Sequence, residues 1–331
     1  MSDARRLAGL VTSARLTVKV NRFELGTGVV VALAAGLAAL FVRSQLEAVG
    51  ATEDCLLRWV ASLTTTVDCS AQVQVWSNVN ETGAGKVMAA MLLVPWVVGV
   101  LAGVPLVARE LESGTAAVAW ALAGSRRRWL VRQAAPILLL VIVVTSAAAI
   151  PAALLAETRS AGGVWSSTFA DADLFGLPVV ARAIAAIAIG LACGALIGRI
   201  LPALIVSLAI AALVVSSIGT IEQSVVHSAY NETSIGGPGD VASFIAANPD
   251  IDVRFVTTGE RVLSLDAALA SVPAGVPDAM SWLQDHYQFV TLGVRSTKTI
   301  EWQLIESAIL VVLSAGFGGL ALAVVGRRSP R

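Results

Sequence analysis

The chain has 331 residues, of which 56% are hydrophobic and only 14% are charged. Soluble domains carry fewer apolar and more charged residues, so this composition excludes a water-soluble globular protein and indicates one that crosses the membrane several times. The basic residues lie along the edges of apolar segments and form no single patch, which argues against a surface for nucleic acid.

Residues 1–25 predict an amphipathic helix that lies along the inner headgroup region of the membrane. Apolar residues recur at roughly helical spacing, and the face between them carries Arg5, Arg6, Arg15, Lys19 and Arg22. A twin-arginine export signal at Arg5-Arg6 is the alternative, but the long apolar stretch begins only at residue 26. A cleaved signal peptide fits poorly, because the apolar run that follows is longer than a usual signal core.

Six apolar segments long enough to cross a bilayer follow, at residues 26–42, 87–107, 130–155, 179–197, 201–218 and 304–325. With six spans, both termini lie on one side. That side holds 14 of the 23 Lys and Arg residues and 4 of the 23 Asp and Glu residues, leaving 9 and 19 on the other. The positive-inside rule therefore puts both termini, including the tail at 327–331, in the cytoplasm. The predicted fold class is an all-α polytopic membrane protein.

The first external loop, residues 43–86, contains Cys55 and Cys69. Disulfides persist outside the reducing cytoplasm, so the sequence predicts a bond between these two cysteines, with two unpaired thiols as the alternative. The third cysteine, Cys193, falls inside a predicted span and is expected to be a small packing residue.

The fourth predicted span, 179–197, and the residue after it place glycines at four-residue spacing, at Gly190, Gly194 and Gly198. Two overlapping GxxxG steps let another helix approach closely, so we expect helix packing here, within the subunit or across a dimer. Arg182, near the outer end of this span, is expected to extend to the membrane interface without a functional role. The turn at 198–202 is so short that the fourth and fifth spans must form a hairpin.

The longest polar stretch, residues 219–301, is rich in Gly, Pro and Asp and predicts a small external domain of mixed structure. Its period-two apolar runs, 253–256 and 262–265, are too short to assign a fold. Aromatic residues that could supply a small core are Phe244, Phe255, Trp282, Tyr287 and Phe289.

Glu306 lies one turn inside the last span, four residues after Trp302. A carboxylate is costly in lipid, so we expect Glu306 to face protein or a watery cavity. Two interpretations stay open: Glu306 and Trp302 belong to an outer gate, or Glu306 is a satisfied structural carboxylate.

The loop between the second and third spans, residues 108–129, predicts a short cytoplasmic helix rimmed with charge. Thr115 is a candidate N-cap for an apolar helix at 116–123, Gly124 a candidate stop, and Ser125 a candidate cap for the next helix. The stretch from Val107 to Arg132 holds five arginines, Arg109, Arg126, Arg127, Arg128 and Arg132.

Glu110, Gly114-Thr115 and Ser125-Arg126, in this order between the second and third spans, resemble the signature of ABC-2 type permeases, the membrane subunits of ATP-driven exporters. The run from Trp302 to Glu306 also resembles the start of the last span in actinobacterial members, although Phe289 stands where a proline is expected. The resemblance implies that the loop is a coupling helix that docks on a separate ATPase. The residues expected to couple are Arg109, Glu110, Glu112, Gly114, Thr115, Ser125, Arg126, Arg127 and Arg128.

The resemblance implies the permease subunit of an ABC-2 exporter in a cell membrane, bacterial by expectation. Its implied partners are a cytoplasmic ABC ATPase and a second permease, identical or different, with no nucleic acid. The chain lacks a GxxxxGK[ST] phosphate loop, so we expect the ATPase to bind ATP and Mg²⁺ and this chain to be no enzyme and to hold no cofactor or metal.

The scarcity of charge within the spans favours an amphipathic or lipid-like substrate, such as a drug, an antibiotic or a lipid. One alternative function is a non-transporting immunity or sensor subunit associated with an ABC ATPase. Another is a membrane receptor or enzyme that uses the external domain.

Overall fold

A computed structural model describes residues 19–52, 55, 69–159, 171, 173–232, 250–256, 262–273, 276, 282–283, 286–294 and 296–328. Most of the predicted interfacial helix at 1–25 lies outside the described residues, and so does Phe244 of the predicted external core. The last residues of that predicted segment, Arg22 to Leu25, form the first turn of a long helix.

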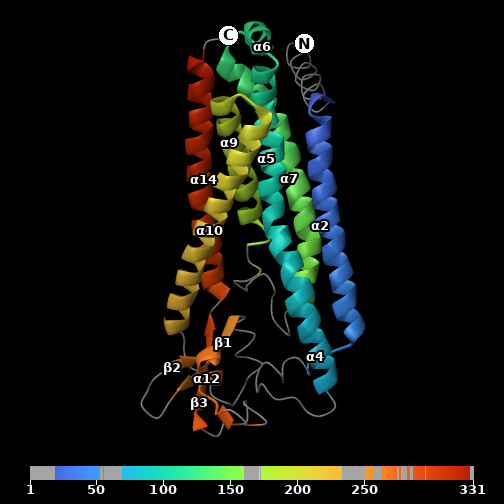
Figure 1. The fold of residues 1–331 in the computed structure, drawn as a ribbon, viewed down its shortest axis with the longest axis vertical. Helices are drawn as coiled ribbons and strands as arrows, with labels where there is room; N and C mark the ends of the chain where they lie inside the picture. Colours follow the sequence, from blue (N-terminus) through green and yellow to red (C-terminus); the bar gives the residue numbers. More distant parts are fainter. Residues whose placement is uncertain are drawn as a thin grey trace, which may run out of the picture.

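Six long helices run along the molecule's longest axis (Figure 1), each apolar and long enough to cross a membrane. They are α2 (Arg22–Val49), α5 (Gly85–Glu112), α7 (Arg126–Arg159), α9 (Leu177–Ile197), α10 (Ile200–Glu232) and α14 (Ser296–Arg327). The chain is a multi-pass membrane protein, and the all-α six-span class predicted from hydropathy is confirmed.

The helices reach further than the predicted spans at the end opposite the short helix α6 (Ala116–Leu122). The helix α2 continues to Val49, and α4 (Ser70–Asn78) leads through a π-helical turn, η1 (Val79–Ala84), directly into α5. Much of the described part of the predicted loop 43–86 is therefore helical. Hydropathy missed these extensions because polar contacts within a helix, such as the 2.7 Å bond from Arg43 to Glu47, support it outside the apolar span.

The helix α9 lies at the centre of the bundle and packs mainly against α5 and α14, while α2 and α7 pack against each other and against α5. Glycines let the backbones of α5 and α9 touch. A methyl group at Gly103 would lie 2.7 Å from the carbonyl oxygen of Ile187, and one at Gly194 would lie 2.7 Å from that of Val104. The glycine face of the fourth span therefore contacts a helix of the same chain.

A three-stranded antiparallel sheet lies at the opposite end of the long axis from α6 (Figure 1). It contains β1 (Asp250–Val256), β2 (Val262–Ser264) and β3 (Gln288–Val294), in the order β2-β1-β3. After β2 comes α12 (Leu265–Leu269), whose Ala268 is buried together with Leu283, and Trp282 and Tyr287 pack against them. The described part of the segment 219–301 contains both helix and strand, and α10 extends into this segment as far as Glu232.

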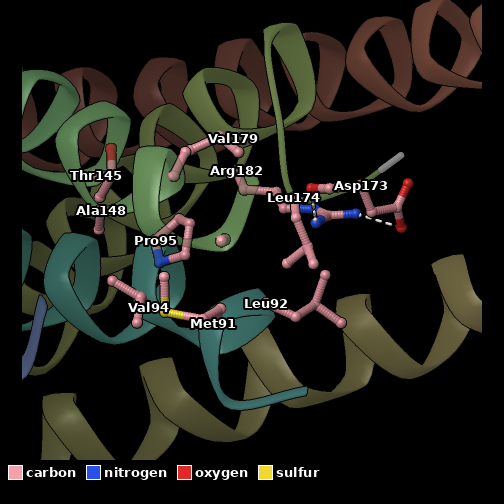
Figure 2. Close-up of a pocket in the computed structure, with 12 residues that line it drawn as sticks. Met91, Leu92, Val94, Pro95, Thr145, Ala148, Asp173, Leu174, Val179 and Arg182 are labelled. Carbon is pink, nitrogen blue, oxygen red and sulfur yellow. Dashed lines mark hydrogen bonds and ion pairs between the residues drawn. The ribbon is translucent and has the colours of Figure 1, made fainter. Parts of the chain in front are cut away.

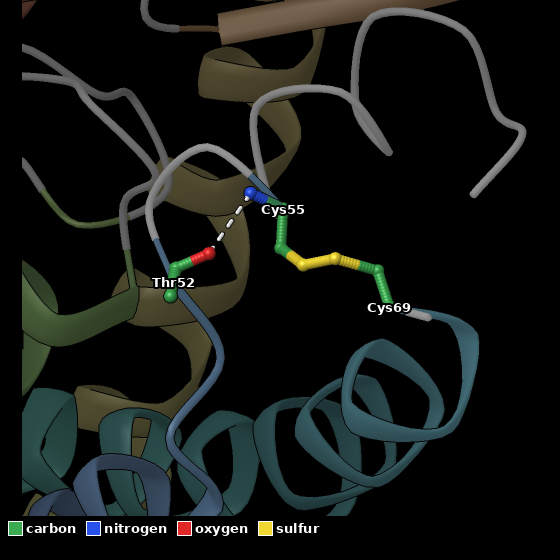
Figure 3. Close-up of a disulfide and its surroundings, with 3 residues drawn as sticks. All are labelled: Thr52, Cys55 and Cys69. Atoms are coloured by element: carbon green, nitrogen blue, oxygen red, sulfur yellow. Dashed lines mark hydrogen bonds between the residues drawn. A yellow bond between two sulfur atoms is a disulfide. The ribbon is translucent and has the colours of Figure 1, made fainter. Parts of the chain in front are cut away.

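Cys55 and Cys69 form a disulfide that ties the segment after α2 to the start of α4 (Figure 3). The backbone N–H of Cys55 donates to the hydroxyl of Thr52 at 3.3 Å. Because the disulfide closes a loop outside the spans, it stabilises the connection by limiting the freedom of the unfolded chain. We call this half of the molecule the sheet end and the opposite half the α6 end.

Candidate functional site

Two glycines set α6 apart from the long helices on either side of it. Gly114 and Gly124 have φ angles of +73° and +71°, which side chains rarely tolerate, so the chain can turn sharply before and after α6. The hydroxyl of Ser125 accepts the backbone N–H of Arg128 at 3.2 Å, which confirms Ser125 as the cap of α7. Thr115 makes no such cap bond, because its hydroxyl donates instead to the carboxylate of Glu110.

The carboxylate of Glu112 caps a different helix. It accepts the backbone N–H of Ile200 at 2.9 Å, at the first residue of α10. A negative side chain at a helix N-terminus satisfies an unpaired N–H and interacts favourably with the helix dipole. The loop between α5 and α6 is thereby joined to the hairpin between α9 and α10.

Two of the predicted coupling arginines also make contacts within the chain. Arg109 on α5 donates to the carbonyl oxygen of Val20 at 2.9 Å and pairs with the carboxylate of Glu24 on α2. Arg126 donates to the carbonyl oxygens of Gly326 and Arg328, at 3.3 and 2.5 Å, and lies 5.0 Å from the ring centre of Trp120. These arginines hold the ends of α2 and α14 close to α6.

The outward face of α6 is apolar. Trp120 is buried and packs edge-on against Trp129, with 6.3 Å between ring centres. Val118 and Leu122 point the other way and are 64% and 84% exposed, and Arg127 and Arg128 near the start of α7 are exposed as well. Our sequence analysis missed Val118 and Leu122. Their spacing of four residues, with Trp120 between them, was a usable signal for a surface opposite the core.

A cavity of about 320 Å³ lies beside this surface, between α2, α5, α6 and α7. Its walls include apolar side chains and polar ones from both sides of the loop, among them Leu106, Arg109, Glu110, Leu122, Trp129 and Arg132. The predicted coupling residues Glu110 and Arg109 therefore face a recess, and Gly114, Arg127 and Arg128 lie on the outside.

A second group of charged residues is buried nearer the sheet end. Arg182 on α9 donates to Glu306 on α14 at 2.7 Å. It also donates to the carbonyl oxygen of Asp173 at 2.6 Å and pairs with the carboxylate of Asp173, as Figure 2 shows. Arg182 is only 3% exposed, so the expectation that it extends to the interface is wrong. The two carboxylates hold the guanidinium inside the protein.

Glu306 is fully buried, as expected of a carboxylate that faces protein, and Trp302 beside it is buried too. A small cavity of about 10 Å³, enough for about one water molecule, lies between α5, α7 and α9 next to Asp173 and Arg182 (Figure 2). Sequence reasoning selected Glu306 and Trp302 but missed Asp173, which precedes α9 in a polar connection and gave no signal.

Arg159 at the end of α7 anchors the same connection from outside. It pairs with Asp171 at 3.0 Å and donates to the side chain of Asn80 at 2.7 Å. Burial raises the pKa of the Asp171 carboxyl above its usual range, although Arg159 acts in the opposite direction. Within the described residues, no group of three or more His, Cys, Asp and Glu side chains could hold a metal ion.

Comparison with protein families gives one match. The family model described as ABC-2 membrane transporter related matches residues 27–221, which is more than half of the chain and runs from α2 into α10. No curated protein and no solved structure matches.

Proposed function

The chain belongs to the ABC-2 membrane transporter related family, and we propose that it is the permease subunit of an ATP-driven exporter. In this proposal a separate ABC ATPase binds ATP and Mg²⁺, and a second permease completes the membrane pathway. In this proposal the α6 end faces the cytoplasm, because most of the arginines that the structure describes lie there, as the positive-inside rule requires. The membrane is expected to be that of a bacterial cell.

The observation that carries this proposal is the exposed apolar surface of α6. Val118 and Leu122 lie beyond the membrane spans, where apolar side chains gain nothing from lipid, and the exposed Arg127 and Arg128 follow a few residues later in the chain. Apolar anchors with a charged rim are typical of a protein interface. We therefore assign the contact with the ATPase to these four residues.

Hydrogen bonds at the α6 end can pass a movement of α6 to the spans. Glu112 holds the first residue of α10, Arg126 holds the end of α14, and Arg109 holds the start of α2, each through hydrogen bonds. Three of the residues that we expected to touch the ATPase, Arg109, Glu112 and Arg126, therefore serve better as links between the α6 end and three spans. These three spans are the first, the fifth and the sixth.

Copurification tests the docking surface. Leu122→Glu should abolish recovery of an ATPase subunit with the tagged permease from native membranes in mild detergent, because a carboxylate cannot enter an apolar interface without a partner. The matched control is Leu269→Glu, at an exposed apolar residue of α12 at the sheet end, which should leave the ATPase bound. If wild-type permease recovers no ATPase, or if both variants recover it equally, the assignment is wrong.

The cargo follows from the composition of the spans. Among the described residues, the spans bury few charges besides Arg182 and Glu306, which suits an amphipathic or lipid-like substrate better than an ion or a sugar. Reconstituted permease and ATPase should hydrolyse ATP faster when such a compound is added and should move it across the vesicle membrane. Stimulated ATP turnover without movement of the compound would indicate a sensor subunit.

A further inference from the structure

The buried cluster of Asp173, Arg182 and Glu306 contains two carboxylates and one guanidinium. The three side chains come from the connection before α9, from α9 and from α14, and each is nearly or fully buried. With both carboxylates ionised, the cluster carries a net charge of −1. A buried charge without a partner is strongly unfavourable, so this arrangement needs one more positive charge.

No second cation contacts the cluster among the described residues. Some ionisable side chains on the elements packed around it lie toward the sheet end, and the others, on α5, α7 and α14, lie at the α6 end. Arg159 is paired with Asp171, Lys298 with Glu301, and Lys86 and Glu157 are exposed, while Glu222 on α10 has an interaction of its own. Since no described side chain supplies it, we look for the missing positive charge in a small cation that enters the cluster.

The geometry favours a proton. One oxygen of Asp173 and one of Glu306 both lie 2.6 Å from the same nitrogen, Nη2 of Arg182, so the two carboxylates are neighbours. The other oxygen of each, Oδ1 of Asp173 and Oε2 of Glu306, is buried and has no hydrogen-bond partner among the described residues. A proton on either carboxylate removes the excess charge and supplies the missing donor, as in other carboxylate pairs that share a site.

We propose that the cluster is a proton-binding site in which Asp173 and Glu306 share one proton at neutral pH. Release breaks one O–H bond of a carboxylic acid and passes the proton to water, with no change in oxidation state. The small cavity lined by Asp173 and Arg182 has room for about one water molecule, which can accept it. Release leaves a net negative charge at the junction of α9, α14 and the connection before α9, and so weakens the packing that closes this half of the bundle.

Infrared spectroscopy of the purified chain tests the proposal without transport or an ATPase, so its outcome is independent of the proposed function. At neutral pH the wild-type protein should show the carbonyl stretching band of a protonated carboxylic acid in an apolar site. In Glu306→Gln or Asp173→Asn, one carboxylate remains and pairs with Arg182 one to one. It therefore stays ionised, and the band should disappear.

Two control variants separate this cluster from other carboxyls. Glu301→Gln changes an exposed carboxylate of α14 that pairs with Lys298, and Asp171→Asn changes the buried carboxyl beside Arg159. Both should keep the band. Absence of the band in wild-type protein, or its persistence in both Glu306→Gln and Asp173→Asn, would overturn the proposal.

Labelling covers the case in which a variant does not fold. In wild-type protein that carries ¹³C in the carboxyl groups of aspartate and glutamate, the band should shift. Labelling each amino acid separately should show which of them carries the proton.

The thermal midpoint of unfolding gives a second measurement. A group that is protonated in the folded state and ionised in the unfolded state makes stability fall as pH rises. The midpoint of wild-type protein should therefore fall toward alkaline pH, and that of Glu306→Gln should fall less.

Discussion

The charged residues at the α6 end and those of the Arg182 cluster are of the same types but have different environments. The charged side chains at the α6 end are half-buried or exposed, and each makes a hydrogen bond to a partner of its own. They are Arg109, Glu110, Glu112 and Arg126. In the cluster, two carboxylates share one guanidinium away from water. We expect the charges at the α6 end to affect the position of the helix ends. We expect the buried charges of the cluster to have a larger effect on the packing of the spans.

The largest effect is expected when the guanidinium of the cluster is removed. Arg182→Met leaves the carboxylates of Asp173 and Glu306 buried side by side, and breaking a buried ion pair in this way costs about 3–5 kcal/mol. The thermal midpoint and the yield of monodisperse protein in detergent should both drop sharply. The control Arg43→Met removes an exposed pair with Glu47 and should cost less than about 1 kcal/mol. Equal losses in the two variants would contradict the contrast between the environments.

A second contrast concerns glycines at the helix contact and glycines facing outward. Gly194→Ala places a methyl group 2.7 Å from the carbonyl oxygen of Val104. It should destabilise the protein by about 1–3 kcal/mol, because the backbones of α5 and α9 must move apart. Gly318→Ala on α14 meets nothing within 4 Å and should be neutral or stabilising. Thermal unfolding of the two variants side by side measures the difference. A neutral Gly194→Ala would mean that α5 and α9 are not in close contact.

The cap of α10 should give a smaller loss of stability. Glu112→Ala leaves the N–H of Ile200 without its partner, and losing a helix cap costs about 0.5–2 kcal/mol. Glu112→Gln keeps an acceptor but loses the charge, so its midpoint should lie between those of wild type and Glu112→Ala. In the reconstituted complex, Glu112→Ala should bind the ATPase yet transport less per ATP hydrolysed. Unchanged coupling would remove Glu112 from the route between α6 and α10.

The smallest effect on stability is expected at the two exposed arginines. Arg127→Gln and Arg128→Gln should change the free energy of unfolding by less than about 0.5 kcal/mol, because both side chains are exposed and surface substitutions rarely matter. Binding of the ATPase should weaken and should become less sensitive to salt, since charges at the rim of an interface act over a distance that salt screens. A large drop in stability would show that these arginines hold the fold and not a partner.

The spans were predictable because each needs a long run of apolar residues, and such a run can be found in the sequence without knowledge of the fold. Their ends were not, since Arg43, Glu47 and the residues of α4 continue the helices through polar sequence. The short helix α6 was predictable from Gly114, Gly124 and Ser125, which mark its ends. The spacing of Trp120 and Leu122 puts them on opposite faces of α6, but which of the two faces turns inward depends on how α6 packs on α7.

The contacts within the buried cluster could not be predicted from the sequence. Arg182 and Glu306 are 124 residues apart and meet only because α9 and α14 pack together. Glu112 and Ile200, 88 residues apart, meet for a similar reason at the α6 end. A charged residue in a span can be singled out from its cost in lipid, but its partner is set by tertiary packing.

Photocrosslinking tests the central claim, that α6 is the surface on which an ATPase docks. A photoreactive amino acid at position 122 should form a crosslink to the ATPase subunit in native membranes, and one at position 269 on α12 should form none. A crosslink at position 122 that is lost when Val118 is also changed to Glu would assign the contact to the outward face of α6. If position 122 yields no crosslink to an ATPase, or position 269 does so equally well, α6 is not the docking element and the account fails.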